Sequence, residues 1–398
     1  MRAVASLPVA LLLCFAGCVE TGEVLGPAAS GDGPSDPELP ALAASAVSAG
    51  HTHACALYSG QVACWGANQR GQLGVGDVNE RRTPTFVALE VAVRQVTAAD
   101  RHTCSLDELG RVYCWGLNDR GQLGVGTRVA SLLPAPVILP ARATAIASSF
   151  AHVCALLADA SLWCWGQNSE GELGQADPFP PRDDDAERAT DKLSPVRVPG
   201  TFQSVDTGQG HTCGIRADRS LWCWGRNTRS ELGTAAGGQV REPTRVGTDS
   251  DWRSVDAGQH HTCALKANGS LWCWGENIDG GFPLGIEANR VEAPSPVGAA
   301  STWVALSAHI FHTCARDVAF DLYCWGRNVE GQLGVGDLQL RRSPTRAGGG
   351  FAAVSVGSFF TCALRRDGRV VCAGENAAGQ LGKGDTDRAA VFEPVELP

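Results

Sequence analysis

The chain has 398 residues, 44% of them hydrophobic, and a formal net charge of −9 at pH 7. This length suits two average domains or one large β architecture, and the composition supplies enough apolar side chains for a packed core. The negative charge argues against a nucleic-acid partner, because binding to phosphates needs clustered Lys and Arg. No apolar run reaches the roughly 18 residues that would indicate a membrane-spanning helix in the mature protein.

The N-terminus has the pattern of an export signal. An apolar stretch runs from Val4 to Phe15, and the small-residue site Phe15-Ala16-Gly17-Cys18 follows. This site resembles a bacterial lipobox, which implies cleavage before Cys18 and acylation of that residue; an ordinary secretory signal is the alternative. We expect a lipoprotein signal peptide at 1–17 and a flexible tether rich in Gly, Pro, Ser and Asp at 18–45. The lipid alone would then hold the protein on the outer membrane or surface of a bacterial cell.

One sequence unit recurs seven times between residues 46 and 398. Its clearest mark is a pair of cysteines nine or ten residues apart. The first cysteines of successive pairs are separated by 49, 50, 59, 50, 51 and 48 residues, and this regular period indicates a repeat architecture. The pairs account for 14 of the 16 cysteines and are Cys55 with Cys64, Cys104 with Cys114, Cys154 with Cys164, Cys213 with Cys223, Cys263 with Cys273, Cys314 with Cys324 and Cys362 with Cys372.

Each cysteine pair lies on a predicted β-hairpin. Side chains alternate with period two, so that Cys263 and Leu265 share one face and lie opposite Cys273 and Leu271. This pairing leaves a three-residue turn that ends at Gly269, which suits the left-handed residue of a bulged hairpin. Gly110 and Gly368 fill the same slot, the first copy is shortened to Ser59-Gly60, and Ala160, Arg219 and Phe320 predict strained or differently shaped turns.

Two further strands complete each unit. The hairpin is followed by W-G-x-N-x-x-G-Q-L-G, as in Trp65–Gly74, then by a Pro-started strand such as Pro84–Val87, and then by a strand that leads to the next cysteine pair. Four short strands in each unit of about 50 residues predict an all-β, seven-bladed β-propeller with four-stranded blades. The C-terminal segment Phe392–Pro398 matches the Pro-started strand. We expect it to close the ring by completing the blade of Cys55 and Cys64, which removes open sheet edges.

The recurring motifs G-x-x-H-[ST]-C-A-L and W-G-x-N-x-x-G-Q-L-G resemble the regulator of chromosome condensation repeat, whose members form seven-bladed propellers. The resemblance covers residues 46–398. The added cysteine pair in each blade resembles exported bacterial versions of the repeat. The intracellular eukaryotic relative exchanges nucleotide on a small GTPase and binds chromatin, but its functional residues have no positional match here, and an exported chain does not meet a cytoplasmic GTPase.

Two chemistries are open to the cysteines. Opposed cysteines on antiparallel strands lie within disulfide distance, and an exported chain matures where disulfides form. Zinc would need His261 together with Cys263 and Cys273, which supply only three ligands and lack a CxxC knuckle. We therefore expect seven local disulfides and neither a metal ion nor another cofactor.

The repeated histidines and tryptophans indicate packing rather than chemistry. A catalytic residue has no reason to recur in six blades, and Phe360 replaces the histidine in the seventh unit, where Ala373 replaces the tryptophan. We expect both sets to be buried between or within blades. They are His53, His102, His152, His211, His261 and His312, and Trp65, Trp115, Trp165, Trp224, Trp274 and Trp325.

The positions that differ between units are candidates for recognition. Just before each cysteine hairpin lies a short loop with different contents in every unit, and equivalent loops of a propeller lie on one face of the ring. Ordinary solvated turns are the alternative. The candidate partner-binding residues are His51, Asp100, Arg101, Phe150, Gln209, Gln259, His260, His309, Ile310, Phe311 and Phe359.

An acidic insertion lengthens the third spacing to 59 residues. Asp183, Asp184 and Asp185 could hold calcium, but they lack the regular oxygen spacing of a known calcium loop, so a solvated loop is favoured. Phe179, among prolines, is a candidate contact for a partner. The chain has no nucleophile elbow, zinc-protease, phosphate-loop or dinucleotide motif, and we expect no catalytic residues.

The sequence favours a monomeric, non-enzymatic propeller that binds an unidentified protein partner outside the cytoplasm. The alternative is an inhibitor of an enzyme such as a β-lactamase, because exported bacterial relatives include propeller inhibitors of that enzyme. A hydrolase or carbohydrate-active propeller would require paired carboxylates near the central channel. A nucleotide-exchange factor is disfavoured by the export signal.

Overall fold

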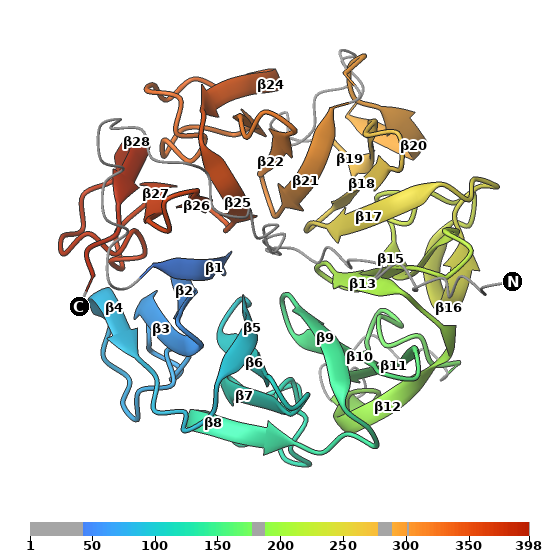
Figure 1. The fold of residues 1–398 in the computed structure, drawn as a ribbon. Helices are drawn as coiled ribbons and strands as arrows, with labels where there is room; N and C mark the ends of the chain where they lie inside the picture. Colours follow the sequence, from blue (N-terminus) through green and yellow to red (C-terminus); the bar gives the residue numbers. More distant parts are fainter. Residues whose placement is uncertain (1–42, 177–187, 278–288, 301, 398) are drawn as a thin grey trace, which may run out of the picture.

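A computed structural model of the protein describes residues 43–176, 188–277, 289–300 and 302–397. Seven antiparallel sheets of four strands each are arranged around a central axis (Figure 1). The prediction of an all-β, seven-bladed propeller is confirmed. No helix within the described ranges is long and apolar enough to cross a membrane.

Each blade is built from four strands that are consecutive in the sequence. The first strand of a blade lies next to the axis and the fourth at the rim (Figure 1). The blades are β1 (Ala44–Ala49), β2 (His53–Tyr58), β3 (Gln61–Gly66) and β4 (Arg81–Phe86); β5 (Val93–Ala98), β6 (His102–Asp107), β7 (Val112–Gly116) and β8 (Ser131–Val137); β9 (Ala143–Ser148), β10 (His152–Leu157), β11 (Ser161–Gly166) and β12 (Lys192–Thr201); β13 (Ser204–Thr207), β14 (His211–Ile215), β15 (Leu221–Asn227) and β16 (Gly238–Arg245); β17 (Trp252–Ala257), β18 (His261–Lys266), β19 (Leu271–Glu276) and β20 (Arg290–Pro296); β21 (Trp303–Ala308), β22 (His312–Asp317), β23 (Leu322–Gly326) and β24 (Arg341–Gly348); β25 (Phe351–Val356), β26 (Phe360–Arg365), β27 (Val370–Gly374) and β28 (Ala389–Pro394).

The predicted mode of ring closure is wrong. The C-terminal strand β28 pairs with β27 of its own blade, with Cys372 opposite Glu393, and not with the blade of Cys55 and Cys64. Every Pro-containing strand folds back onto the second cysteine strand that precedes it, and β28 follows the same rule. The chain enters the first blade with its innermost strand at Ala44, two residues before the expected boundary at 46, so this blade is complete without the C-terminus.

The ring closes instead through hydrogen bonds between the first and last blades. The amide of Ala49 donates to Ser355 Oγ at 2.9 Å, and the indole of Trp65 donates to the Gln380 carbonyl at 2.9 Å. At the rim, the amide of Gly384 donates to the Arg82 carbonyl at 3.0 Å. These bonds are of the same kind as those that join other neighbouring blades, so the junction differs little from the rest of the ring.

The repeated tryptophans pack between blades, as predicted. The indole of Trp115 is fully buried and donates to the Gln72 carbonyl of the preceding blade at 2.9 Å. Its ring lies directly beneath Gly74, where a Cβ would come within 2.6 Å of the indole nitrogen, which explains the glycine that ends the W-G-x-N-x-x-G-Q-L-G motif. In the last blade, Phe392 of β28 occupies the corresponding position under Gly334 and fills the space that Ala373 leaves.

The repeated histidines form a second set of hydrogen bonds between neighbouring blades, which we call the histidine clasp. His53 Nε2 lies 2.8 Å from Thr103 Oγ1 of the next blade, and that hydroxyl donates to the Gln72 carbonyl at 2.8 Å. Because the hydroxyl has only one proton, His53 Nε2 is the donor to Thr103. The imidazole is neutral, because burial lowers the pKa of His53 to about 3. The predicted packing role is confirmed, and the same clasp joins His211 to Thr262 and His312 to Thr361.

The repeated cysteines form seven disulfides, as predicted. Each joins directly opposed residues of the second and third strands of a blade, with a Cα–Cα separation of 4.1 Å. The zinc alternative is excluded, because these sulfurs are bonded to one another. The bonded pairs are Cys55 and Cys64, Cys104 and Cys114, Cys154 and Cys164, Cys213 and Cys223, Cys263 and Cys273, Cys314 and Cys324, and Cys362 and Cys372.

The turns of these hairpins also have the predicted conformations. The last slot of the turn has a positive φ where it holds glycine, as at Gly269. Non-glycine residues in the slot adopt the same left-handed conformation, with φ of 64° at Ala160, 61° at Arg219 and 63° at Phe320. This conformation is strained for residues with a Cβ.

Candidate partner-binding face

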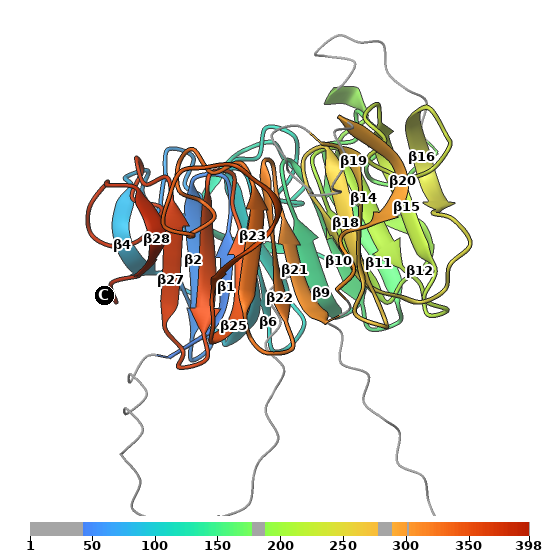
Figure 2. The same cartoon turned by 90° about the horizontal axis from the view of Figure 1, so that it is seen from above.

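One end of the ring collects all the variable loops. Strands of a blade alternate in direction, so the loop between its first and second strands and the loop between its third and fourth strands emerge at the same end (Figure 2). We call this end the loop face; the hairpin turns lie at the opposite face. The predicted binding residues all belong to the first kind of loop and therefore do share one face. The W-G-x-N-x-x-G-Q-L-G loops, interpreted from the sequence only as scaffold, contribute to the same face.

An aromatic cluster lies where the last two blades meet the first. The rings of Phe311 and Phe359 are 5.3 Å apart, and His51 contacts Phe359 edge-on at 6.2 Å. The guanidinium of Arg327 lies 5.3 Å from the Phe311 ring, within the range of a cation–π interaction. His51 also approaches Asp100 of the next blade, with 3.7 Å between Nδ1 and Oδ1. These four side chains, His51, Phe311, Arg327 and Phe359, are half-buried and form a preorganised patch with aromatic and cationic character.

Two predicted residues meet across the axis of the ring. Phe150 of the third blade stacks on His309 of the sixth, with ring centroids 6.2 Å apart and planes inclined by 22°. These blades lie on opposite sides of the ring, so the pair covers the channel at the loop face. Burial lowers the pKa of His309 to about 3, and the ring is neutral at physiological pH. The contact makes the centre of the loop face a surface rather than an open pore.

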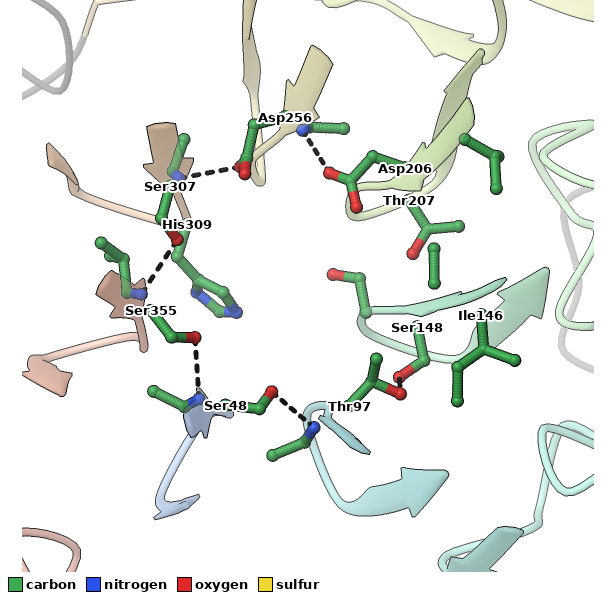
Figure 3. A pocket seen from close by; sticks show the side chains of 18 of the residues that line it. Ser48, Thr97, Ile146, Ser148, Asp206, Thr207, Asp256, Ser307, His309 and Ser355 are labelled. Atoms are coloured by element: carbon green, nitrogen blue, oxygen red, sulfur yellow. Dashed lines mark hydrogen bonds between the residues drawn. The ribbon is translucent and has the colours of Figure 1, made fainter. Parts of the chain in front are cut away.

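Below this pair, the channel is lined by a circle of hydrogen bonds (Figure 3). In most blades, a side-chain oxygen near the end of the innermost strand accepts from the next blade, as when Ser48 Oγ accepts from the Ala98 amide at 2.9 Å. Ser307 and Ser355 repeat the arrangement, and Ala147 interrupts it. The cavity inside this circle has about 70 Å³, far below the roughly 300–1,000 Å³ of ligand pockets.

Two carboxyl groups stand side by side in this circle. Asp206 accepts from the Ala257 amide at 2.7 Å, and Asp256 accepts from the Ala308 amide at 2.8 Å (Figure 3). Burial raises the pKa of Asp206 to about 7, and burial with repulsion from Asp206 raises the pKa of Asp256 well above its ordinary range. A hydrolase would require paired carboxyl groups beside a site that is open to substrate. Each carboxyl is bonded to the neighbouring blade, and the cavity beside them is too small for a sugar ring, so the pair fits a structural role.

A larger hollow opens on the loop face between the second, third and fourth blades. We call it the polar bowl; its volume is about 420 Å³, within the range of ligand pockets. Four predicted residues line it, namely Asp100, Arg101, Phe150 and Gln209. Sequence reasoning missed the other lining side chains, because they belong to the recurring W-G-x-N-x-x-G-Q-L-G loops; they include Asp119, Arg120, Gln167, Glu170, Glu172 and Arg226.

Arg226 ties two further predicted residues to the scaffold. Its guanidinium donates to the Gln259 carbonyl and lies 2.9 Å from His260 Nδ1, while its Nε donates to Glu231 at 2.8 Å. Burial, followed by the charge of Arg226, lowers the pKa of His260 to about 3. Gln259 and His260 are therefore held in place by internal contacts and shape the rim of the loop face.

Of the remaining predicted site residues, some lie on the loop face and others lie outside the described residues. Ile310 is half-buried on the loop face, and Arg101 is exposed beside Asp100 at 3.6 Å. Cys18, Phe179, Asp183, Asp184 and Asp185 lie outside the described residues, the last four between β11 and β12. Within the described ranges, no group of three or more His, Cys, Asp or Glu side chains is placed to hold a metal ion.

Comparisons with known proteins agree with this architecture. The family model described as an RCC1-like domain matches residues 16–348, and the regulator of chromosome condensation (RCC1) repeat matches residues 351–380. A search of curated protein sequences finds no significant match.

Similar solved structures share the fold at low sequence identity. Human WBSCR16 is 19% identical, with a TM-score of 0.75 over 85% of this chain and 94% of that one. Prp20p from Saccharomyces cerevisiae is 21% identical, with a TM-score of 0.73 over 84% and 85% of the two chains. The ectodomain of the Physcomitrella patens receptor kinase CR4 is 20% identical, with a TM-score of 0.52 over 84% and 74%. With most of its length matched by one family model, and with seven blades built from that family's repeat, the chain belongs to the RCC1-like domain family.

Proposed function

We propose that the protein is a non-enzymatic interaction module that binds a protein partner through its loop face. The observation that carries the proposal is the separation of constant from variable positions. The repeated cysteines are buried in disulfides and the histidines and tryptophans repeated in six blades are buried between blades, whereas the residues that differ gather at one end as an aromatic cluster, a covered channel mouth and a polar bowl. Aromatic and arginine side chains in a rigid frame are typical of energetically dominant contacts at protein interfaces.

Solved relatives support this use of the fold. The structure of Prp20p is described together with its binding to Gsp1p and histones, and another structure shows Kap60 bound to the same yeast protein. At 21% and 18% identity these likenesses concern the fold, so the partner of this chain is a separate question. An inhibitor of an enzyme would be one form of the proposed binding, in which the partner's active site meets the loop face.

We further propose that the protein works outside the cytoplasm as a lipoprotein. Seven disulfides are typical of an oxidising compartment and would be unusual in a reducing cytosol. The predicted lipobox at Cys18 supports the same compartment. Loss of membrane association in a Cys18→Ala variant, with the disulfides intact, would be the expected result.

Site-specific photocrosslinking in the native envelope tests the binding face. A photoreactive phenylalanine analogue would replace Phe311 or Phe359 on the loop face, and Leu109 or Val318 at exposed hairpin turns of the opposite face. We expect the loop-face positions to capture one common protein, identified by mass spectrometry, and the opposite positions not to capture it. Capture of the same protein from Leu109 and Val318, with none from Phe311 and Phe359, would refute the proposal.

A further inference from the structure

Glu172 occupies a position where most blades carry glutamine. In the W-G-x-N-x-x-G-Q-L-G loop this slot holds Gln72, Gln122, Gln332 and Gln380, but glutamate at positions 172 and 231. In both glutamates, Oε2 accepts from the amide two residues earlier at 2.7 Å, so the two carboxyl groups are held in the same way. Both side chains are fully buried. The two carboxyl groups differ in what meets the second oxygen, Oε1.

Glu231 has its own cation, whereas Glu172 lacks one among the described residues. Glu231 Oε1 accepts from Arg226 Nε at 2.8 Å, and Arg226 is the variable residue of W-G-x-N in the same blade. The equivalent residue in the blade of Glu172 is Gln167, which bonds to Ser169 instead. Glu172 Oε1 is therefore buried with no hydrogen-bond partner in the described part of the chain, although the side chain forms part of the wall of the polar bowl. A buried carboxylate is costly unless a cation lies beside it, and for Glu172 the described residues supply no such cation.

Some acceptors of the bowl have no cation or donor of their own among the described residues. Arg226 is paired with Glu231, and Arg120 lies 3.1 Å from Asp191, a carboxylate that it shares with Arg128 at 2.8 Å, so both guanidinium groups of the wall already have an internal partner. Within the described residues, Glu170 and Glu172 form no ion pair closer than 4 Å, and Gln209 Oε1, another wall atom, lacks a donor. The bowl thus presents two unsatisfied acceptors, Glu172 Oε1 and Gln209 Oε1, and space for an incoming donor.

We propose that the polar bowl receives a basic side chain of the partner, with arginine favoured, whose guanidinium takes at Glu172 the place that Arg226 takes at Glu231. This inference rests on the proposed function for the source of the cation, but the site itself can be tested without a partner. Arginine is favoured over lysine because a planar guanidinium has donors enough for Glu172 and Gln209 together. Arg120 Nη2, which has no hydrogen bond among the described residues, is available for a carbonyl of the same partner segment.

Proton binding gives this site a distinctive pH dependence. Burial, with repulsion from Glu170 and Asp191, raises the pKa of Glu172 to about 8. Arg101, Arg120, Arg226, Asp100, Asp119 and His152 also line the bowl; burial keeps His152 neutral by lowering its pKa to about 3. A cation must displace the proton on Glu172 below pH 8, so affinity should rise with pH, by up to about tenfold per pH unit between pH 6 and 8.

The experiment uses butylguanidinium as a probe for the arginine side chain, with binding to the full-length protein followed by ligand-observed NMR. Glu172→Gln restores the residue of four sibling blades and should fold, and Gln167→Arg should fill the site from within, as Arg226 does. We expect both variants to weaken binding at least tenfold, and Glu242→Gln, which removes an exposed carboxyl on β16, to change it less than twofold.

Three results would overturn the inference: no binding to the wild-type protein, binding by Glu172→Gln within twofold of wild type, or affinity that does not rise between pH 6 and 8. Probe binding that obeys the prediction while the crosslinked partner maps to the opposite face would instead refute the proposed function and leave the cation site intact.

Discussion

Replacing Asp206 and Asp256 with serine should stabilise the ring, and only above acidic pH. Serine is the residue that accepts the same interblade hydrogen bond at Ser48, Ser307 and Ser355, so the change keeps the bond and removes the buried carboxyl. In the folded protein the pKa of Asp206 is about 7, against an ordinary value of 3.8, and that of Asp256 is raised as well. At a pH between the ordinary and the raised pKa, both carboxyl groups hold protons in the folded protein that they release in the unfolded chain.

The direction in which stability changes with pH follows from this difference in proton binding. The folded state binds more protons than the unfolded state between pH 3.8 and about 7, so the wild-type protein loses stability as the pH rises through this range. For Asp206 alone, the raised pKa corresponds to about 4 kcal/mol, and to about 2–4 kcal/mol if water in the channel screens part of it. With an unfolding entropy of about 2.1 cal/mol/K per residue, a ring of ~350 residues would gain roughly 3–5 °C in Tm.

Thermal unfolding under oxidising conditions at pH 4 and pH 8 measures the effect. We expect the double serine variant to exceed wild type at pH 8 by at least this margin, and by much less at pH 4, because pH 4 lies close to the unfolded-state pKa of 3.8 and little of the difference in proton binding has accumulated there. Asp206→Asn, which keeps an acceptor without a charge, should reproduce part of the gain. A double variant that is no more stable than wild type at pH 8, or whose advantage is equal at both pH values, would refute the reasoning.

Three further substitutions test the packing between blades, each by thermal or urea unfolding. Relative to His102, Val153 of the next blade occupies the position that Thr103 occupies relative to His53, and His102 Nε2 has no partner among the described residues. His102→Phe, which introduces the residue found at Phe360, should therefore stabilise the folded protein by about 1–3 kcal/mol, whereas His53→Phe breaks the bond to Thr103 and should destabilise it by about 1–2 kcal/mol. The reverse order would contradict the histidine clasp. Gly124→Ala places a Cβ 2.7 Å from the Trp165 indole nitrogen, whereas Gly126→Ala shares the positive φ but meets nothing closer than 3.8 Å. The Gly124 variant should therefore lose at least about 2 kcal/mol more free energy of unfolding than the Gly126 variant. Equal losses would show that the close contact is unimportant. Arg219→Gly relieves a left-handed residue at φ 61° and should stabilise by about 1 kcal/mol, and a loss of stability there would contradict the strain.

The repeat determines most of the fold, and the sequence shows it directly. Period-two alternation, the opposed cysteines and the turn at Gly269 predict the hairpin in its correct register, which the structure confirms with Cys263 opposite Cys273 and Leu265 opposite Leu271. The repeat does not show where one blade ends and the next begins, because a periodic pattern has no natural boundary. The closure error came from this ambiguity: the Pro-started strand could be assigned to the blade before it or to the blade after it.

The candidate site was predictable in part. Differences between copies identify the loops that form the aromatic cluster, but a contact across the ring, such as that between Phe150 and His309, depends on the ring geometry. The acidic pair in the channel could not be foreseen, because the sequence does not show that these positions accept hydrogen bonds from the next blade. Glu172 was detectable, since aligning the seven loops shows glutamate at two positions and an arginine beside only one of them.

The central claim is that the loop face binds the partner, and one affinity measurement tests it most directly. The protein captured by crosslinking would be purified and titrated against wild type, the loop-face variant Phe311→Ala/Phe359→Ala and the opposite-face variant Leu109→Ala/Val318→Ala. Truncation of two aromatic anchors at about 2 kcal/mol each predicts Kd weakened by about 1,000-fold in the loop-face variant, with the opposite-face variant within twofold of wild type. Unchanged Kd in the loop-face variant would contradict the account.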